Sequence, residues 1–122
     1  QVAGPGPRSK GMVVKMGMKS KTKGKTGERE VAALLRDHGF EAARGVQYQG
    51  GPGSPDVVHS IAGVHIEVKR CEALGLYTAM DQAQADAGAG EAPIVLHRRN
   101  DKPWLVICRA EDWLEWMKRL ST

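Results

Sequence analysis

The sequence predicts an α/β domain in which a mixed β-sheet is flanked by helices. Three segments repeat apolar residues at helical spacing, and five shorter apolar runs have the length of strands. Their order along the chain is α-β-β-β-α-β-β-α, without an internal repeat, and a mixed sheet covered by helices is the natural packing for that order. At 122 residues the chain supports one domain with one modest core.

The first helix is predicted over residues 26–38. Thr26 can act as the N-cap, and Glu28 in the first turn suits the helix dipole. Gly39 fits the left-handed position that follows a helix, so that Phe40 folds back as in a Schellman motif. The predicted buried stripe consists of Val31, Leu34, Leu35 and His38.

The strands are predicted from apolar runs bounded by turn residues. Residues 41–48 are the weakest candidate, and residues 49–55 form a loop because their glycines and prolines exclude regular structure. The other predicted strands are residues 56–60, 64–70, 94–99 and 104–108. The last two of these form a hairpin that turns at Asn100-Asp101.

Two further helices are predicted, one before and one after this hairpin. The second helix covers residues 76–87 and ends at Gly88, and the third covers residues 111–120. Trp116 lies off the main stripe of the third helix and is a candidate for a dimer interface. The residues expected to face the core are Leu76, Met80, Ala83 and Ala87 in the second helix and Trp113, Met117 and Leu120 in the third.

The net charge of +4 arises from the N-terminus. Residues 1–30 hold eight Lys or Arg against two Glu, whereas residues 31–122 hold ten against twelve acidic residues. We therefore divide the chain into a flexible basic arm (residues 1–22) and a folded domain (residues 23–122). The arm is either a solvated tail or a segment that neutralises phosphates.

The composition also predicts where the protein acts. No run of apolar residues is long enough for a membrane span, and the N-terminus lacks the apolar core of a secretory signal. Cys71 and Cys108 have neither zinc-ligand spacing nor the density of a disulfide scaffold, so we expect reduced thiols in a cytoplasmic protein.

Two charged motifs lie in neighbouring strand-like runs. Pro55-Asp56 is followed, after ten residues, by Glu67-Val68-Lys69. Because side chains alternate along a strand, Glu67 and Lys69 share a face, and pairing of the two strands would let Asp56 and Glu67 reach one ion. Carboxylates bind hard divalent cations, and a lysine complements a developing anion. A metal-dependent site is one interpretation, and an ion-pair ladder on an edge strand is the other.

The order of these motifs resembles the PD-(D/E)XK nuclease superfamily, and within it the archaeal-type Holliday junction resolvases and their phage relatives. The similarity extends over residues 23–120 and implies a restriction-endonuclease-like fold. It consists of a helix that opens with Gly24-Lys-Thr-Gly-Glu28-Arg29-Glu30, of Arg44 before a Gly/Ser loop into Asp56, and of Glu67-Val68-Lys69. The end of the fourth strand, His97-Arg98-Arg99-Asn100, is more similar to the phage members.

The resemblance implies an Mg²⁺-dependent endonuclease, with Mn²⁺ able to substitute. Its catalytic residues would be Glu28, Asp56, Glu67 and Lys69. Asp56 and Glu67 would be metal ligands, and Glu28 would complete the metal's shell from the helix, unless it only stabilises the helix dipole. Lys69 would orient the water or stabilise the transition state.

A glutamine on the second helix is a further candidate. Many nucleases of this superfamily carry a glutamine near the attacking water, and here Gln82 is the candidate for that position. Gln84 is an equal candidate, and a solvent-exposed position without a catalytic role is the alternative for both.

DNA contacts are predicted from basic residues and from the loop before Asp56. Arg98 and Arg99 end a strand and alternate between its faces, so we expect only one of them to hold a phosphate. The predicted DNA-binding residues are Lys21, Lys23, Lys25, Arg29, Arg44, Ser54, Arg70, Arg98 and Arg99.

The function implied is that of a homodimeric Holliday junction resolvase in DNA recombination and repair. It would cleave four-way DNA junctions from within a bacterial, archaeal or phage-infected cell. The alternatives are a restriction-like or replication/repair nuclease of the same superfamily, and a catalytically inactive DNA-binding module. Retention of all four polar positions argues against the inactive module.

Overall fold

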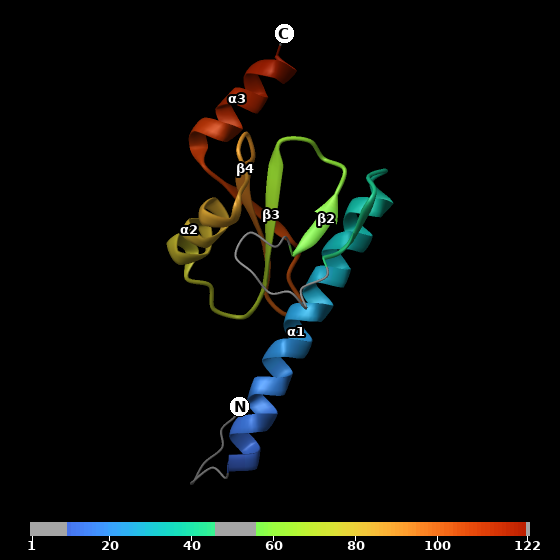
Figure 1. The fold of residues 1–122 in the computed structure, drawn as a ribbon, viewed down its shortest axis with the longest axis vertical. Helices are drawn as coiled ribbons and strands as arrows, with labels where there is room; N and C mark the ends of the chain where they lie inside the picture. The colour runs from blue at the N-terminus through green and yellow to red at the C-terminus, as the bar shows by residue number, and fades with distance from the viewer. Residues whose placement is uncertain (1–9, 46–55, 122) are drawn as a thin grey trace.

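The computed structural model describes residues 10–45 and 56–121. Within these ranges the fold consists of three helices and five short strands, in the order that the sequence predicts (Figure 1). The helices are α1 (Lys10–Asp37), α2 (Leu76–Asp86) and α3 (Ala110–Leu120). The strands are β1 (Ala42–Arg44), β2 (Val57–His59), β3 (Val64–Arg70), β4 (Ala92–Arg98) and β5 (Leu105–Cys108).

The central sheet is mixed, as predicted. Strand β4 lies between β3, to which it is parallel, and β5, to which it is antiparallel. Helix α2 connects the two parallel strands, since such a connection needs a crossover of many residues. Strands β1 and β2 form a separate antiparallel pair beside α1.

The central sheet separates two helices. Helix α1 packs on one face of β3 and α2 packs on the other, which Figure 1 shows as helices on opposite sides of the sheet. Side chains of β3 alternate accordingly. Ile66 and Val68 join Val31 in the main core beneath α1. Glu67 and Lys69 therefore belong to the α2 face, where Val95 packs with alanines of α2.

Helix α1 starts earlier than predicted but ends as predicted. It begins at Lys10, so Thr26 lies inside the helix and is not its N-cap. At the other end Gly39 has φ of +94°, and Phe40 N–H donates to Leu35 O at 3.0 Å. These features confirm the Schellman motif. The early start has a local cause, because lysine and methionine are good helix formers and the helix needs no cap at Thr26.

The buried faces of α2 and α3 agree with the prediction only in part. In α2 Ala83 is buried and Met80 packs beside it, as predicted, whereas Ala79 is buried as well and Leu76 is exposed. In α3 Trp116 packs against the main core, whereas Trp113 is 50% and Leu120 is 77% exposed. The prediction was wrong for Trp113 and Leu120, because helical spacing identifies a wide apolar stripe on α3 but does not tell which part of it meets the core.

The remaining elements agree with the prediction within a few residues. Strand β3 has the predicted bounds, and the β4–β5 turn contains Asp101 with φ of +60°. Residues 46–55, which include the predicted loop and Ser54, lie outside the described residues. Cys71 and Cys108 are free thiols, as expected.

Candidate active site

A glycine in α1 brings this helix into close contact with β3. A Cβ atom at Gly27 would lie 2.6 Å from the Cβ of Arg70 and 3.4 Å from Cγ1 of Val68. Only a residue without a side chain fits there. The close approach places the next residue of the helix, Glu28, beside the strands that carry the predicted metal ligands.

Asp56 is tied to the backbone of the neighbouring strand. Its Oδ2 accepts a hydrogen bond from the amide of Val68 at 2.8 Å. Val68 lies between Glu67 and Lys69, so this bond fixes the Asp56 carboxylate beside both of them. The hydrogen bond restricts the rotation of the Asp56 side chain and so keeps its carboxylate in place.

Glu67 is buried in the α2 face of β3. Its residue is only 3% exposed, and burial raises the pKa of its carboxyl group, with the Asp56 charge as the second cause. His65 and Lys69 act in the opposite direction and lower the pKa. Two carboxylates that repel each other in a poorly solvated place form an environment that a divalent cation would stabilise.

Glu28 lies within electrostatic reach of Asp56. Desolvation is the largest cause of a raised pKa of Glu28, and the Asp56 charge adds to it. Arg44 opposes both effects, because its Nε donates to Glu28 Oε1 at 2.8 Å. Arg44, a predicted DNA contact, thus forms an ion pair with an acidic residue of the site.

Lys69 faces helix α2. Its Nζ donates to Gln82 Oε1 at 2.8 Å and lies 3.9 Å from Glu67 Oε2. Gln82 therefore holds the predicted catalytic lysine. Gln84 is also exposed on α2, and among the described residues it has no hydrogen bond to the predicted site.

A group that the sequence did not predict lies next to Glu67. Among the described residues, His65, Glu67 and Asp86 each offer a ligand atom, and these atoms lie within 4.8 Å of one another. Asp56 and Glu28 are not part of this group. The β-strand alternation places His65 on the face of Glu67, but only the packing of α2 could bring in Asp86 from 19 residues away.

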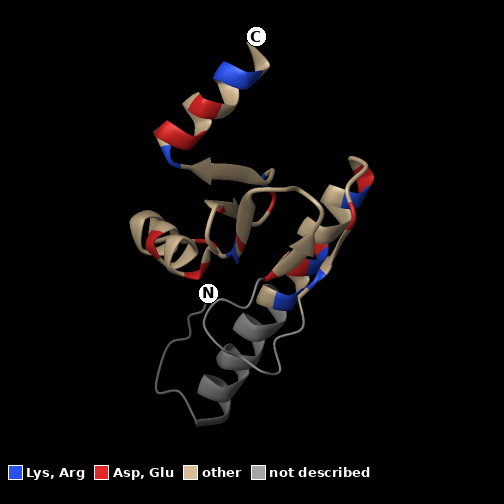
Figure 2. Ribbon diagram, turned by 45° about the horizontal axis from the view of Figure 1, so that its top comes forward, with Lys and Arg blue, Asp and Glu red and all other residues tan. Residues whose placement is uncertain are grey.

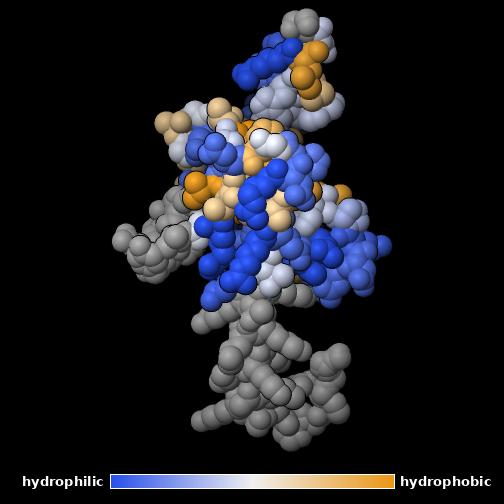
Figure 3. Space-filling model, turned by 90° about the vertical axis from the view of Figure 1, so that its right-hand side faces the viewer, coloured by the Kyte–Doolittle hydropathy of each residue, from blue (hydrophilic) through white to orange (hydrophobic). Residues whose placement is uncertain are grey.

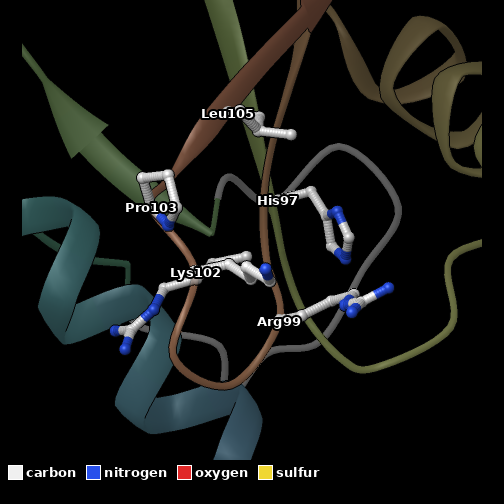
Figure 4. A pocket seen from close by; sticks show the side chains of 6 residues that line it. His97, Arg99, Lys102, Pro103 and Leu105 are labelled. Carbon is white, nitrogen blue, oxygen red and sulfur yellow. The ribbon is translucent and has the colours of Figure 1, made fainter.

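Basic residues gather at the β4–β5 hairpin. They line a cavity of about 330 Å³ whose polar residues include His97, Arg99 and Lys102, and Figure 4 shows these three side chains around it. Arg98 also lines the cavity and pairs with Glu30 at 2.6 Å. The two arginines thus differ in exposure, with Arg99 exposed and Arg98 partly buried.

Arg70 lies between α1 and this hairpin. Its Nη2 donates to Asn100 Oδ1 at 2.8 Å, and its side chain is only 10% exposed. The buried nitrogens without a hydrogen-bond partner in the described part of the chain are Nε and Nη1 of Arg70 and Nε of Arg98. Lys25 and Arg29 are exposed on α1, while the side chains of Lys21 and Lys23 lie outside the described residues.

Comparison with known proteins identifies the family. The model of the archaeal Holliday junction resolvase family (Hjc) matches residues 19–112. The chain belongs to the Hjc family. The solved structure of Archaeoglobus fulgidus Hjc, a Holliday junction resolvase from an archaeal hyperthermophile, is similar at 27% sequence identity with a TM-score of 0.53. The match covers 66% of this chain and 72% of the Archaeoglobus chain. No curated protein sequence matches.

The Hjc assignment establishes several of the predictions at the level of the family. The chain is a junction-resolving nuclease with a restriction-endonuclease-like mixed fold, and its family generally uses a divalent metal. Branched DNA is the partner that the family implies. No helix in the described ranges is both long and apolar enough to cross a bilayer.

Proposed function

We propose that this Hjc family member hydrolyses phosphodiesters of four-way DNA junctions at a centre formed by Glu28, Asp56, Glu67 and Lys69. The single observation that carries this proposal is the bond from the Val68 amide to Asp56, at 2.8 Å. It holds one carboxylate beside the strand that bears the other carboxylate and the lysine.

The residues present fit a divalent cation, and we infer that Mg²⁺ is the physiological one. The donors at Asp56 and Glu67 are carboxylate oxygens, which hard cations prefer. Burial, and then the Asp56 charge, raise the pKa of the Glu67 carboxyl group, so a bound cation would stabilise the ionised form of this group. When bound, such a cation supplies an activated water and a polarised phosphoryl oxygen. Mn²⁺ has the same oxygen preference and is expected to substitute.

Lys69 and Gln82 would act together beside the reacting phosphate. An ammonium group near the phosphate complements the charge that develops on its oxygens. Gln82 accepts one hydrogen bond of this ammonium, which restricts the rotation of a long side chain. We therefore assign Gln82 to the positioning of Lys69, in place of the direct contact with water expected from the sequence.

Basic residues on α1 and on the hairpin would bind the DNA backbone. Lys25 and Arg29 are exposed on α1, and Arg99 and Lys102 line the cavity at the β4–β5 hairpin, whose Arg98 pairs with Glu30 of α1. On the side of the molecule that Figure 3 shows, strongly hydrophilic residues cover a large part of the described surface. Phosphate contacts of this kind give affinity and orientation without base specificity.

We infer that the active protein is a homodimer, because paired cuts across a junction need two active sites in a fixed relation. The surface that supports this inference consists of β5 and α3. Val106 is exposed on edge strand β5, and Trp113, Leu114 and Leu120 are exposed on α3, the helix that follows β5 in the chain. Single exposed apolar residues are ordinary, but several large ones on two consecutive elements favour an interface.

The charges of α3 fit a two-fold arrangement. Its first turn contains Glu111 and Asp112, and its last turn contains Lys118 and Arg119, which Figure 2 shows as red and blue segments. Two copies of α3 packed antiparallel would bring the acidic end of each helix to the basic end of the other. In this antiparallel arrangement the positive end of each helix dipole would also lie beside the negative end of the other, which is favourable.

The finer predictions about cellular context rest on the sequence. We infer a cytoplasmic location from the action of the family on DNA and from the free thiols of Cys71 and Cys108. A phage origin, suggested by the His97–Asn100 segment, is retained as part of the proposal.

The proposal is tested by removing one charge from the centre. Asp56→Asn retains an oxygen that can accept the Val68 hydrogen bond but loses the negative charge. We expect junction cleavage in Mg²⁺ to fall by about a thousandfold or more, equivalent to about 4 kcal/mol, while junction binding persists. Asp81→Asn, the same change at an exposed position of α2, should cleave normally. Cleavage by Asp56→Asn at the normal rate would contradict the assigned centre.

A further inference from the structure

The buried group beside Glu67 has a chemistry that the proposed nuclease centre does not use. His65 Nε2 lies 3.4 Å from Glu67 Oε1, and both side chains are only 4% exposed. Asp86, the last residue of α2, brings a third ligand atom within 4.8 Å of these two. The three residues come from β3 and α2, two elements that pack directly on each other.

The contacts of the Glu67 carboxylate with His65 and Lys69 are long. A separation of 3.4 Å is longer than the 2.7–3.2 Å of a good N–H···O hydrogen bond. The ammonium of Lys69 lies 3.9 Å from Glu67 Oε2 and donates its shorter bond to Gln82. The Glu67 carboxylate and the His65 imidazole therefore meet in a poorly solvated place with only long contacts to each other and to Lys69.

We propose that His65, Glu67 and Asp86 form a second cation position, which takes a divalent transition-metal ion. One imidazole nitrogen and two carboxylates are a ligand set that suits Zn²⁺ or Co²⁺, whereas Mg²⁺ prefers oxygen ligands alone. Glu67 is common to this position and to the proposed centre with Asp56. Because Asp86 ends α2, an ion bound here would also tie that helix to β3.

The proposal rests on the proposed function only through the shared Glu67, so the two can fail separately. Ion binding is measured on the full chain without DNA, and cleavage is measured on a junction. Asp56→Asn removes a ligand of the nuclease centre alone. His65→Gln and Asp86→Asn remove ligands of the second position alone.

The test is a titration of the untagged, full-length protein with Co²⁺, in the presence of excess Mg²⁺. The d–d absorption of bound Co²⁺ reports directly on its ligands. We expect one saturable equivalent in the wild-type protein and in Asp56→Asn. We expect its affinity to fall by about 100-fold or more in His65→Gln and in Asp86→Asn, since even the loss of an outer-shell partner costs about 10–100-fold.

His59→Gln provides the matched control. His59 lies at the end of β2, outside the group of three, so this variant should bind Co²⁺ as the wild type does. Circular dichroism of each variant confirms that it is folded, and Asp86→Asn, at a half-buried position, is the milder of the two changes. Wild-type Co²⁺ affinity in both folded variants would overturn the proposal, and so would the absence of a saturable equivalent in the wild type.

Discussion

The amide of Val68 donates to the carboxylate of Asp56 at 2.8 Å, across the gap between β2 and β3. Val68 faces the core beneath α1, while its neighbours Glu67 and Lys69 face α2. One backbone bond thus sets the position of a carboxylate relative to two charged residues on another strand. The two halves of the motif are consequently held together, although ten residues separate them in the sequence.

The contact of Gly27 with β3 predicts opposite effects for two glycines of the same helix. In Gly24→Ala the added Cβ would have no other atom within 4 Å, so this substitution should stabilise α1 by about 0.5–1 kcal/mol. Gly27→Ala would place a Cβ 2.6 Å from that of Arg70, and this overpacking should cost about 1–3 kcal/mol. Urea denaturation of both variants measures the difference. Equal stabilisation by both substitutions would contradict the close packing of α1 on β3.

The pKa of Glu67 predicts how stability depends on pH when no divalent cation is present. Burial, followed by the Asp56 charge, raises the pKa of this carboxyl group above 4.5. The folded chain then binds this proton more tightly than the unfolded chain, so the contribution of Glu67 to stability is greatest below pH 4.5 and is lost as the pH rises through the folded pKa. Glu67→Gln should therefore be more stable than the wild type at pH 8, with the advantage lost at low pH.

Thermal unfolding in a chelator, from acidic to alkaline pH, measures this effect. Glu41→Gln, at an exposed position, serves as the control and should follow the wild type. If Glu67→Gln is the less stable protein at pH 8, the Glu67 charge is well compensated in the folded chain. That result would remove the electrostatic reason for a cation at this position.

The bond between Lys69 and Gln82 predicts unequal roles for two nearby glutamines. Gln82→Ala should lower the rate of junction cleavage about tenfold, the equivalent of one hydrogen bond of about 1.4 kcal/mol, because Lys69 loses its restraint. Gln84→Ala, on the exposed side of α2, should leave the rate unchanged. Single-turnover cleavage at saturating enzyme separates this effect from DNA binding. Equal rates for both variants would rule out a positioning role for Gln82.

The exposed apolar face of β5 and α3 predicts which substitutions dissociate a dimer. Leu114→Gln on α3 should convert the protein to a monomer, as judged by light scattering during size-exclusion chromatography. Leu76→Gln makes the same chemical change at an exposed leucine of α2 and should leave the dimer intact. Dissociation by Leu76→Gln alone would place the interface on α2 instead.

Features fixed by local patterns could be predicted from the sequence. The Gly39–Phe40 cap of α1 and the bounds of β3 depend on residues close together in the chain, and both agree with the structure. Strand alternation correctly predicted that Glu67 and Lys69 share a face of β3. The predicted pairing of the two motif strands was wrong, because β2 pairs with β1 and Asp56 reaches β3 through its side chain. The structure brings these three charged residues together through the Val68 bond and the α2 face.

Features that depend on tertiary packing could not be predicted. Helical periodicity identifies the apolar stripe of α3 but does not tell which edge meets the sheet, so Trp116 and Trp113 exchanged their expected places. Asp86 carries no local signal at all, because its approach to His65 is set by the way α2 crosses the sheet. The Gly27 contact with Arg70 likewise arises only when α1 packs on β3.

The most direct test of the central claim is the cleavage of a synthetic immobile four-way junction in Mg²⁺, compared with a linear duplex of the same arm sequence. The account predicts paired nicks placed symmetrically about the crossover, no comparable cutting of the duplex, and no cutting in a chelator. Cleavage of the linear duplex as efficient as that of the junction would contradict it.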